Sequence, residues 1–148
     1  GCGVFQSTVS FEYLEVGFAL ELPDRWRGYR VESAYWEGLT NPPESDSGDV
    51  VVESGPMIII HHPESTSENP RQEIPIMVMT ILQWEAMHAQ EWHIGAAPVY
   101  PMEIGRNSQY VFALPARYNY AFLEGWEEVE EIFRDQNIII NEPILPSE

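Results

Sequence analysis

Basic residues are scarce in this chain of 148 residues, which has one cysteine and lacks long apolar runs. Lysine and arginine together number 7, against 24 aspartates and glutamates, and the formal net charge is -17. Affinity for nucleic acids comes chiefly from cations that neutralise phosphates. DNA, RNA and anionic lipid are therefore poor candidates for direct partners, whereas cationic ligands, metal ions included, remain open.

The single cysteine, Cys2, excludes an internal disulfide framework and a cysteine-rich zinc site. It lies almost at the start of the sequence, between Gly1 and Gly3, and in this it resembles the residue that carries the lipid in a processed bacterial lipoprotein. We therefore treat Cys2 as a candidate lipid-attachment site, with a chance terminal cysteine as the alternative. No apolar run approaches the roughly 18 residues of a membrane-spanning helix.

The apolar pattern predicts mostly strands. From Gly17 onward, Phe18, Leu20 and Leu22 alternate with Ala19 and Glu21, which is the period of a half-buried strand. Residues 105–107, GRN, have the spacing of a hairpin turn. Further strands are expected over residues 29–36, 50–54, 56–62, 74–84 and 137–141, and turn-forming residues indicate surface loops over 38–49 and 63–73.

The clearest helix is predicted over residues 121–136. Phe122, Trp126, Val129 and Phe133 recur at helical spacing, while the acidic residues face outward. Inside such a helix, Gly125 costs about 1 kcal/mol relative to alanine. A short helix is expected over residues 85–92.

These elements predict an α+β fold, with a single antiparallel sheet of six to eight strands packed against one long C-terminal helix and one short helix. The expected divisions are an N-terminal leader over residues 1–10, a single domain over 11–142 and a C-terminal tail over 143–148. A chain of this length can bury roughly two-thirds of its unfolded surface, so one core is enough.

The run GFALELPDRWRGYRVE, residues 17–32, resembles the opening of a widespread group of small bacterial secreted proteins and lipoproteins. In that group a strand of the form G-F-x-aliphatic-E-aliphatic-P precedes a tryptophan and G-x-Y. Such domains are similar to the PsbP/Mog1 type of antiparallel α+β fold. Residues 109–115 and 124–133 are similar to the closing section of the group, and residues 38–95 are not. The resemblance implies the fold and export from the cell, but no activity, because the group has none established.

The four histidines raise the question of a metal site. His88 and Glu91 are neighbours on the expected short helix, but His93 lies about 140° around the axis from His88. His61 and His62, being adjacent on a strand, point to opposite faces. His88 and His93 could converge only if the helix ends near Trp92, and a metal site would then combine His88, Glu91 and His93 with His62 or His61. The usual H-E-x-x-H spacing is absent, and the alternative is a set of surface histidines that bind water and backbone.

Two further groups of residues could bind a ligand. Trp26, Tyr35 and Trp36, with Tyr29 nearby, could form an aromatic platform for a sugar or a methylated ammonium group, although core packing is the more common role of large aromatics. Residues Glu44, Asp46 and Asp49 offer oxygen ligands for calcium, but they lack the order of an EF-hand loop.

Nothing in the sequence forms a complete catalytic constellation: there is no G-x-S-x-G motif and no glycine-rich phosphate loop after a strand. We therefore expect a non-catalytic, envelope-associated or secreted domain that binds a protein or a small ligand. The alternative is a metal-binding protein that uses the histidines. No cofactor other than a metal ion is expected, and edge strands allow a monomer or a weak homodimer.

Overall fold

The computed structural model describes residues 8–40, 48–95, 99–135 and 137–144. Strand β1 begins within the range that the sequence analysis assigns to a leader. The elements in chain order are β1 (Thr8–Tyr13), β2 (Phe18–Pro23), the 3-10 helix η1 (Asp24–Trp26), β3 (Arg30–Thr40), β4 (Val50–His61), β5 (Ile74–Thr80), α1 (Ile81–His88), β6 (Met102–Arg106), β7 (Tyr110–Leu114), α2 (Trp126–Arg134) and β8 (Ile138–Ile140).

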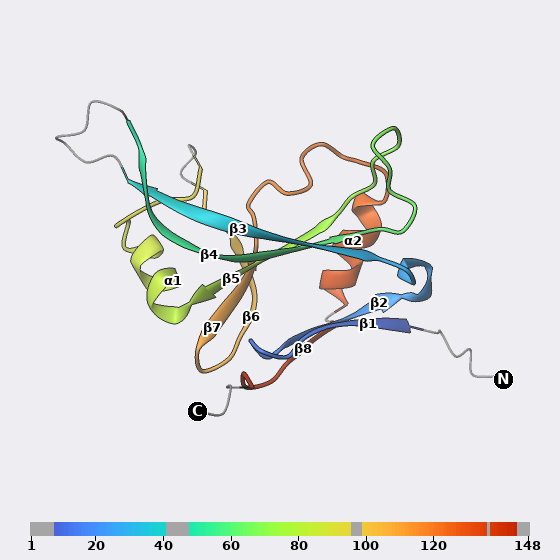
Figure 1. The fold of residues 1–148 in the computed structure, drawn as a ribbon, viewed down its shortest axis with the longest axis horizontal. Helices are drawn as coiled ribbons and strands as arrows, with labels where there is room; N and C mark the ends of the chain where they lie inside the picture. Colours follow the sequence, from blue (N-terminus) through green and yellow to red (C-terminus); the bar gives the residue numbers. More distant parts are fainter. Residues whose placement is uncertain (1–7, 41–47, 96–98, 136, 145–148) are drawn as a thin grey trace.

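The eight strands of these described segments form two antiparallel sheets, so the expectation of a single sheet is wrong (Figure 1). The small sheet has the order β1-β2-β8 and the large sheet the order β3-β4-β5-β7-β6. Periodicity reveals which face of a strand is buried, but it does not reveal the partner strand. Here β8 pairs with β2, and Phe18 lies opposite Ile140 near the other end of the chain.

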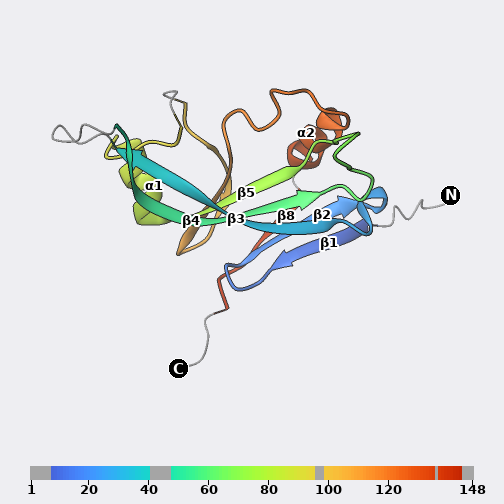
Figure 2. The same ribbon diagram turned by 45° about the horizontal axis from the view of Figure 1, so that its top comes forward.

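The centre of the large sheet, at strand β5, is covered on both faces. Its residues Ile74, Ile76 and Val78 join a first apolar cluster with the small sheet and α2. Its residues Met77 and Met79 join a second cluster, on the other face, with α1. Successive residues of a strand point to opposite faces, so one strand supplies both cores. Figure 2 shows the small sheet and α1 as separate bodies around the large sheet.

Strand β4 is continuous, although the sequence predicts two strands interrupted at Gly55 and Pro56. Proline lacks the N–H that an inner strand must donate. The ladder with β5 covers only Met57 to Ile60, so Pro56 lies just beyond it and has only β3 as its neighbour, opposite Tyr35. The proline is therefore compatible with an uninterrupted strand.

Helix α1 begins four residues before the predicted short helix, and the predicted strand over residues 74–84 ends at Thr80. A capping box sets this boundary. The Thr80 hydroxyl accepts a hydrogen bond from the backbone N–H of Gln83 at 3.0 Å, and the Gln83 side chain accepts one from the backbone N–H of Thr80 at 2.9 Å.

The predicted long C-terminal helix is wrong as well, because α2 spans only Trp126–Arg134. Gly125 lies at its N-cap with φ +87°, a left-handed conformation that ends helical geometry on the N-terminal side. Phe122 therefore lies outside the helix, and Val129 and Ile132 are the helix residues that enter the first core.

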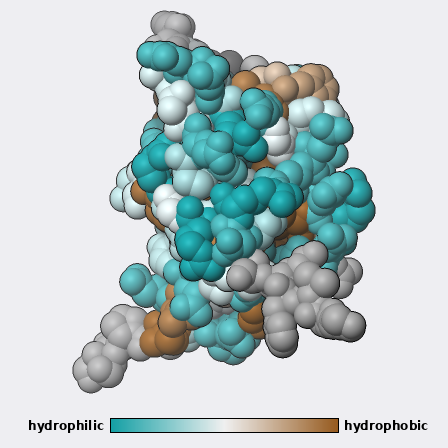
Figure 3. All heavy atoms as spheres, turned by 90° about the vertical axis from the view of Figure 1, so that its right-hand side faces the viewer, coloured by the Kyte–Doolittle hydropathy of each residue, from teal (hydrophilic) through white to brown (hydrophobic). Residues whose placement is uncertain are grey.

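Both helices of the described segments are too short and too polar to cross a lipid bilayer. Seen from the side that carries η1 and α2, the surface is mainly hydrophilic, with small apolar areas (Figure 3). This agrees with the acidic outer positions of α2.

Candidate functional site

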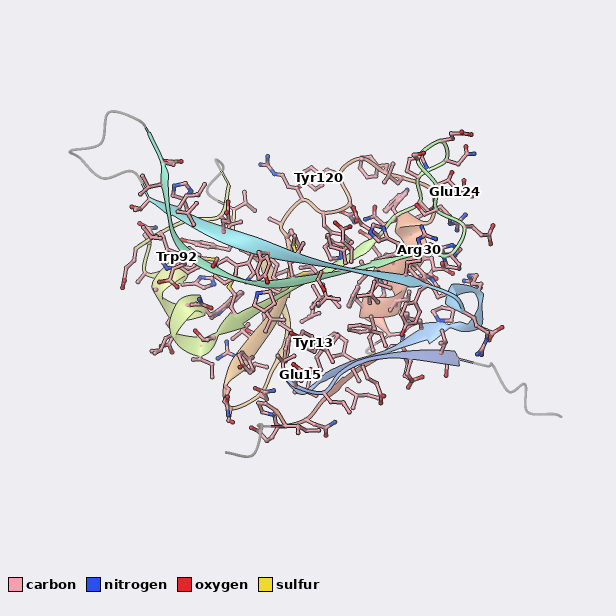
Figure 4. The ribbon with its side chains drawn as sticks, in the orientation of Figure 1. Tyr13, Glu15, Arg30, Trp92, Tyr120 and Glu124 are labelled. Atoms are coloured by element: carbon pink, nitrogen blue, oxygen red, sulfur yellow. The ribbon has the colours of Figure 1, made fainter. Side chains whose placement is uncertain are left out.

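The residues expected to bind a metal lie at two ends of the large sheet. His61 is paired with Arg30 at one end of β3, while the backbone of His93 bridges to Leu39 near the other end. Leu39 lies nine positions after Arg30 on β3, which corresponds to roughly 30 Å along a strand. In Figure 4 the labelled Arg30 and Trp92, the residue before His93, lie toward opposite ends of β3.

The individual histidines also have other partners. His62 is buried and packs edge-on against Trp26, with ring centroids 4.8 Å apart. His88 stacks on Tyr100 at 4.4 Å, and His93 Nδ1 lies 2.5 Å from the carbonyl oxygen of Gly95. Within the described part of the chain, no three histidine, cysteine, aspartate or glutamate residues form a group that could hold a metal ion. The structure therefore does not bring His88, Glu91, His93 and His62 together.

The three aromatic residues expected to form a ligand platform are not on one surface either. Trp26 and Trp36 are buried in different cores, whereas the Tyr35 side chain is 74% exposed. The Trp36 indole donates to the carbonyl oxygen of Val78 at 2.8 Å and stacks on Trp92. Both tryptophans of the platform therefore pack the interior. Cys2, Glu44 and Asp46 lie outside the described residues.

A groove lies where the edge strands of the two sheets meet. Strand β6 is the last strand of the large sheet and β8 is the last of the small one. They approach closely at Gly105, where a Cβ atom would lie 3.0 Å from Cδ1 of Ile140. The end of α2 and residues 115–119 complete the walls around a volume of about 820 Å³, which we call the β6–β8 groove. The walls are formed by Val99, Tyr100, Met102, Glu103, Ile104, Leu114, Pro115, Ala116, Tyr118, Asn119, Glu130, Phe133, Arg134, Ile138 and Ile140.

Asn107 holds the two edge strands in this arrangement. Its side-chain oxygen accepts hydrogen bonds from the backbone of Gln109 and Tyr110, which shapes the turn between β6 and β7. Its amide nitrogen donates to the carbonyl oxygens of Val16 at 2.8 Å and Asn141 at 2.9 Å, which flank the small sheet. One side chain therefore ties the large sheet to the small sheet beside the groove.

Apolar side chains are exposed in one wall of the groove, which is formed by the residues just before β6 and by its first residue. The exposed fractions are 42% for Val99, 39% for Tyr100 and 55% for Met102. Exposed apolar residues that gather at one place commonly mark a binding surface. The polar side chains around them are few, which is typical of small-molecule sites.

Sequence reasoning missed this groove because its walls come from four separate segments between Val99 and Ile140 that belong to different elements and to both sheets. Each segment carries only a local signal. Ile138 and Ile140 belong to the predicted strand over residues 137–141, and Phe133 belongs to the apolar stripe of the predicted helix. No local pattern indicates that β6 and β8 are neighbours, so the groove is visible only in the folded structure.

The chain matches no protein-family model, and no curated protein or solved structure is significantly similar to it.

Proposed function

We propose that this protein is a non-catalytic binding domain that takes up a small ligand with an apolar portion in the β6–β8 groove. The observation that carries the proposal is the exposed apolar wall of Val99, Tyr100 and Met102 around a volume of about 820 Å³. Small-molecule sites commonly measure about 300–1,000 Å³ and combine apolar walls with a few polar groups. The size favours a small molecule over a protein segment as the ligand.

The polar groups of the groove support binding rather than reaction. Glu103 accepts hydrogen bonds from Nε and Nη2 of a neighbouring arginine, Arg106, at 2.8 and 2.9 Å. Glu130 accepts a hydrogen bond from the Asn119 side chain at 3.0 Å. Side chains held in this way can orient a ligand. The proposal also includes a location at the cell envelope or outside the cell, which rests on the resemblance of residues 17–32.

The test is a titration of the full chain with dodecanol, an uncharged amphiphile. Binding is monitored by the NMR chemical shifts of the backbone amides. We expect saturable shifts in β6, β8 and the end of α2. Met102→Glu should weaken binding, because it places a charge in the apolar wall. Val31→Glu is the matched control, since Val31 is an exposed apolar residue on the other edge strand of the large sheet, β3. It should leave binding unchanged.

Two results would contradict the proposal. One is the absence of saturable shifts with dodecanol and with charged amphiphiles of the same chain length. The other is a set of shifts centred on β3 and β4 that Val31→Glu abolishes and Met102→Glu leaves intact.

A further inference from the structure

Arg134 provides an unpaired positive charge at the β6–β8 groove. All 7 basic residues of the chain are arginines. The others contact a carboxylate, a backbone carbonyl oxygen or an aromatic ring. Among the residues that the structure describes, Arg134 has no hydrogen-bond, ion-pair or aromatic partner, although it lines the groove. Arg30 and Arg117 also have no carboxylate partner, but Arg30 bonds to backbone carbonyl oxygens and Arg117 lies over the ring of Tyr120.

The two carboxylates of the groove are already engaged. The hydrogen bond from Arg106 is the main reason why the pKa of Glu103 lies below its usual value. Glu130 lies one helical turn before Arg134, at a spacing that allows an ion pair. It bonds to Asn119 instead. The free hydrogen-bond donor of the groove is therefore the cationic guanidinium of Arg134, whereas the two carboxylates already accept hydrogen bonds.

The Tyr118 hydroxyl is a second free donor in the groove. Burial, and then the charge of Glu130, raise the pKa of Tyr118 to about 12. The hydroxyl therefore keeps its proton at neutral pH and can donate it to an acceptor. No hydrogen-bond partner for this hydroxyl exists within residues 8–40, 48–95, 99–135 and 137–144, and Tyr118 lines the groove together with Arg134.

We propose that the ligand of the β6–β8 groove is a small amphipathic carboxylate, whose anionic group is bound by Arg134 and Tyr118 and whose apolar part lies against Met102, Ile104 and Phe133. The inference rests on the proposed function of the groove and names the class of its ligand. A guanidinium presents two parallel N–H donors that match the two oxygens of a carboxylate. A cationic ligand would meet Arg134 without an unengaged carboxylate to balance it.

The test compares three probes of equal chain length: dodecanoate, dodecanol and dodecyltrimethylammonium. Calorimetric titrations use the full chain at neutral pH and probe concentrations below micelle formation. Dodecanoate should bind about tenfold or more tightly than dodecanol, the usual gain from a charge-assisted hydrogen bond. Dodecyltrimethylammonium should bind the least tightly of the three.

Arg134→Gln should abolish the preference for dodecanoate over dodecanol, and Tyr118→Phe should reduce it by about fivefold, as for one neutral hydrogen bond. Arg27→Gln removes the same charge at a surface pair with Asp24 outside the groove, and it should keep the full preference. Arg134 also lies in the last turn of α2, where a cation interacts favourably with the helix dipole. The readout is therefore the ratio of affinities, which a loss of helix stability does not change.

Each outcome separates this inference from the proposed function. Equal affinities for dodecanoate and dodecanol, or an unchanged preference in Arg134→Gln, would overturn the carboxylate assignment and leave the binding function in place. If dodecyltrimethylammonium bound the most tightly of the three probes, the carboxylate assignment would likewise be overturned and the binding function would stand. Binding of none of the probes would overturn both. A peptide whose free C-terminal carboxylate binds more tightly than dodecanoate would overturn the assignment to a small molecule.

Discussion

At the scale of single residues, the surroundings of His62 favour its neutral form. The side chain is buried, and its Nδ1 atom accepts a hydrogen bond from the backbone N–H of Glu64 at 3.0 Å. The proton of the neutral ring is therefore on Nε2, which has no partner among the described residues. A second proton would remove the bond to Glu64 and place a buried charge near Arg71. Burial first, and then the charge of Arg71, lower the pKa of His62.

This arrangement predicts a loss of stability in mild acid. In the unfolded chain His62 titrates near its ordinary pKa of 6.5. Above that pH both states hold a neutral ring, and His62 adds no pH dependence. As the pH falls below 6.5, the unfolded state binds the proton first, so the free energy of unfolding decreases. The decrease is at most about 1.4 kcal/mol per pH unit and ends once the folded ring is protonated.

Urea unfolding at a series of pH values measures this effect. The quantity compared is the free energy of unfolding of the wild type and of His62→Gln at each pH. The His62→Gln variant should show a flatter profile below pH 6.5. His88→Gln, a change at the surface, is the control and should keep the wild-type profile. Parallel profiles for the wild type and His62→Gln would show that His62 does not contribute.

At the scale of elements, the start of α2 depends on Gly125. Replacing a glycine inside a helix by alanine stabilises the protein. Replacing a glycine at φ +87° does not, because an L-residue is strained in that left-handed conformation. The Cβ atom would also lie 3.3 Å from Nη2 of Arg71. The predicted long helix and the observed short one therefore imply opposite effects of the same substitution.

We expect Gly125→Ala to lower the free energy of unfolding by about 1–2 kcal/mol, the cost of a left-handed conformation for an L-residue. Gly125→Asn should lower it by less, since asparagine tolerates this region better than alanine does. Chemical denaturation of the three proteins gives the comparison. A stabilised Gly125→Ala protein would mean that residue 125 is helical, as the sequence analysis supposed.

The elements themselves were largely predictable, but their boundaries were not. Alternation in residues 17–22 gave β2 correctly, and the hairpin around residues 105–107 corresponds to β6 and β7. The apolar run over residues 74–84 predicts one strand, whereas β5 ends at Thr80, which forms a capping box with Gln83. Glu128 was expected to face solvent, but it accepts a hydrogen bond from the Trp26 indole at 3.0 Å and pairs with Arg25. No sequence pattern indicates this contact, because η1 and α2 are far apart in the chain and become neighbours only in the folded protein.

At the scale of the whole molecule, Asn107 is the polar link between the two sheets beside the groove. We expect Asn107→Asp to destabilise the protein by about 2 kcal/mol or more, because a carboxylate cannot donate to the carbonyl oxygens of Val16 and Asn141. The same carboxylate still accepts the turn hydrogen bonds of Gln109 and Tyr110, which keeps the hairpin.

Urea unfolding measures this change, and Ser108→Ala is the control in the same turn. Among the described residues, the Ser108 hydroxyl bonds only to the exposed side chain of Glu142, so its loss should cost much less. Equal stabilities of Asn107→Asp and the wild type would show that the link between the sheets is energetically neutral.

The groove could not be predicted because its position depends on which strands become edges. The sequence supplied the apolar character of β8 and of the α2 stripe, but neither the separation into two sheets nor the contact of Gly105 with Ile140. Among the residues singled out for chemistry, Trp26, Trp36 and His62 are interior, whereas Tyr35 is exposed. The resemblance to secreted PsbP/Mog1-like domains stays a prediction.

The pairing of β2 with β8 has a consequence for biosynthesis. Phe18 finds its partner Ile140 only after the long stretch of chain between them has left the ribosome, since synthesis proceeds from the N-terminus. The β1–β2 hairpin is made before β8 and remains without its third strand until residues 138–140 have been synthesised. Contacts between such distant residues also slow folding. During that interval the apolar face of the nascent hairpin, with Phe18, Leu20 and Leu22, is the surface at which newly made chains are most prone to associate.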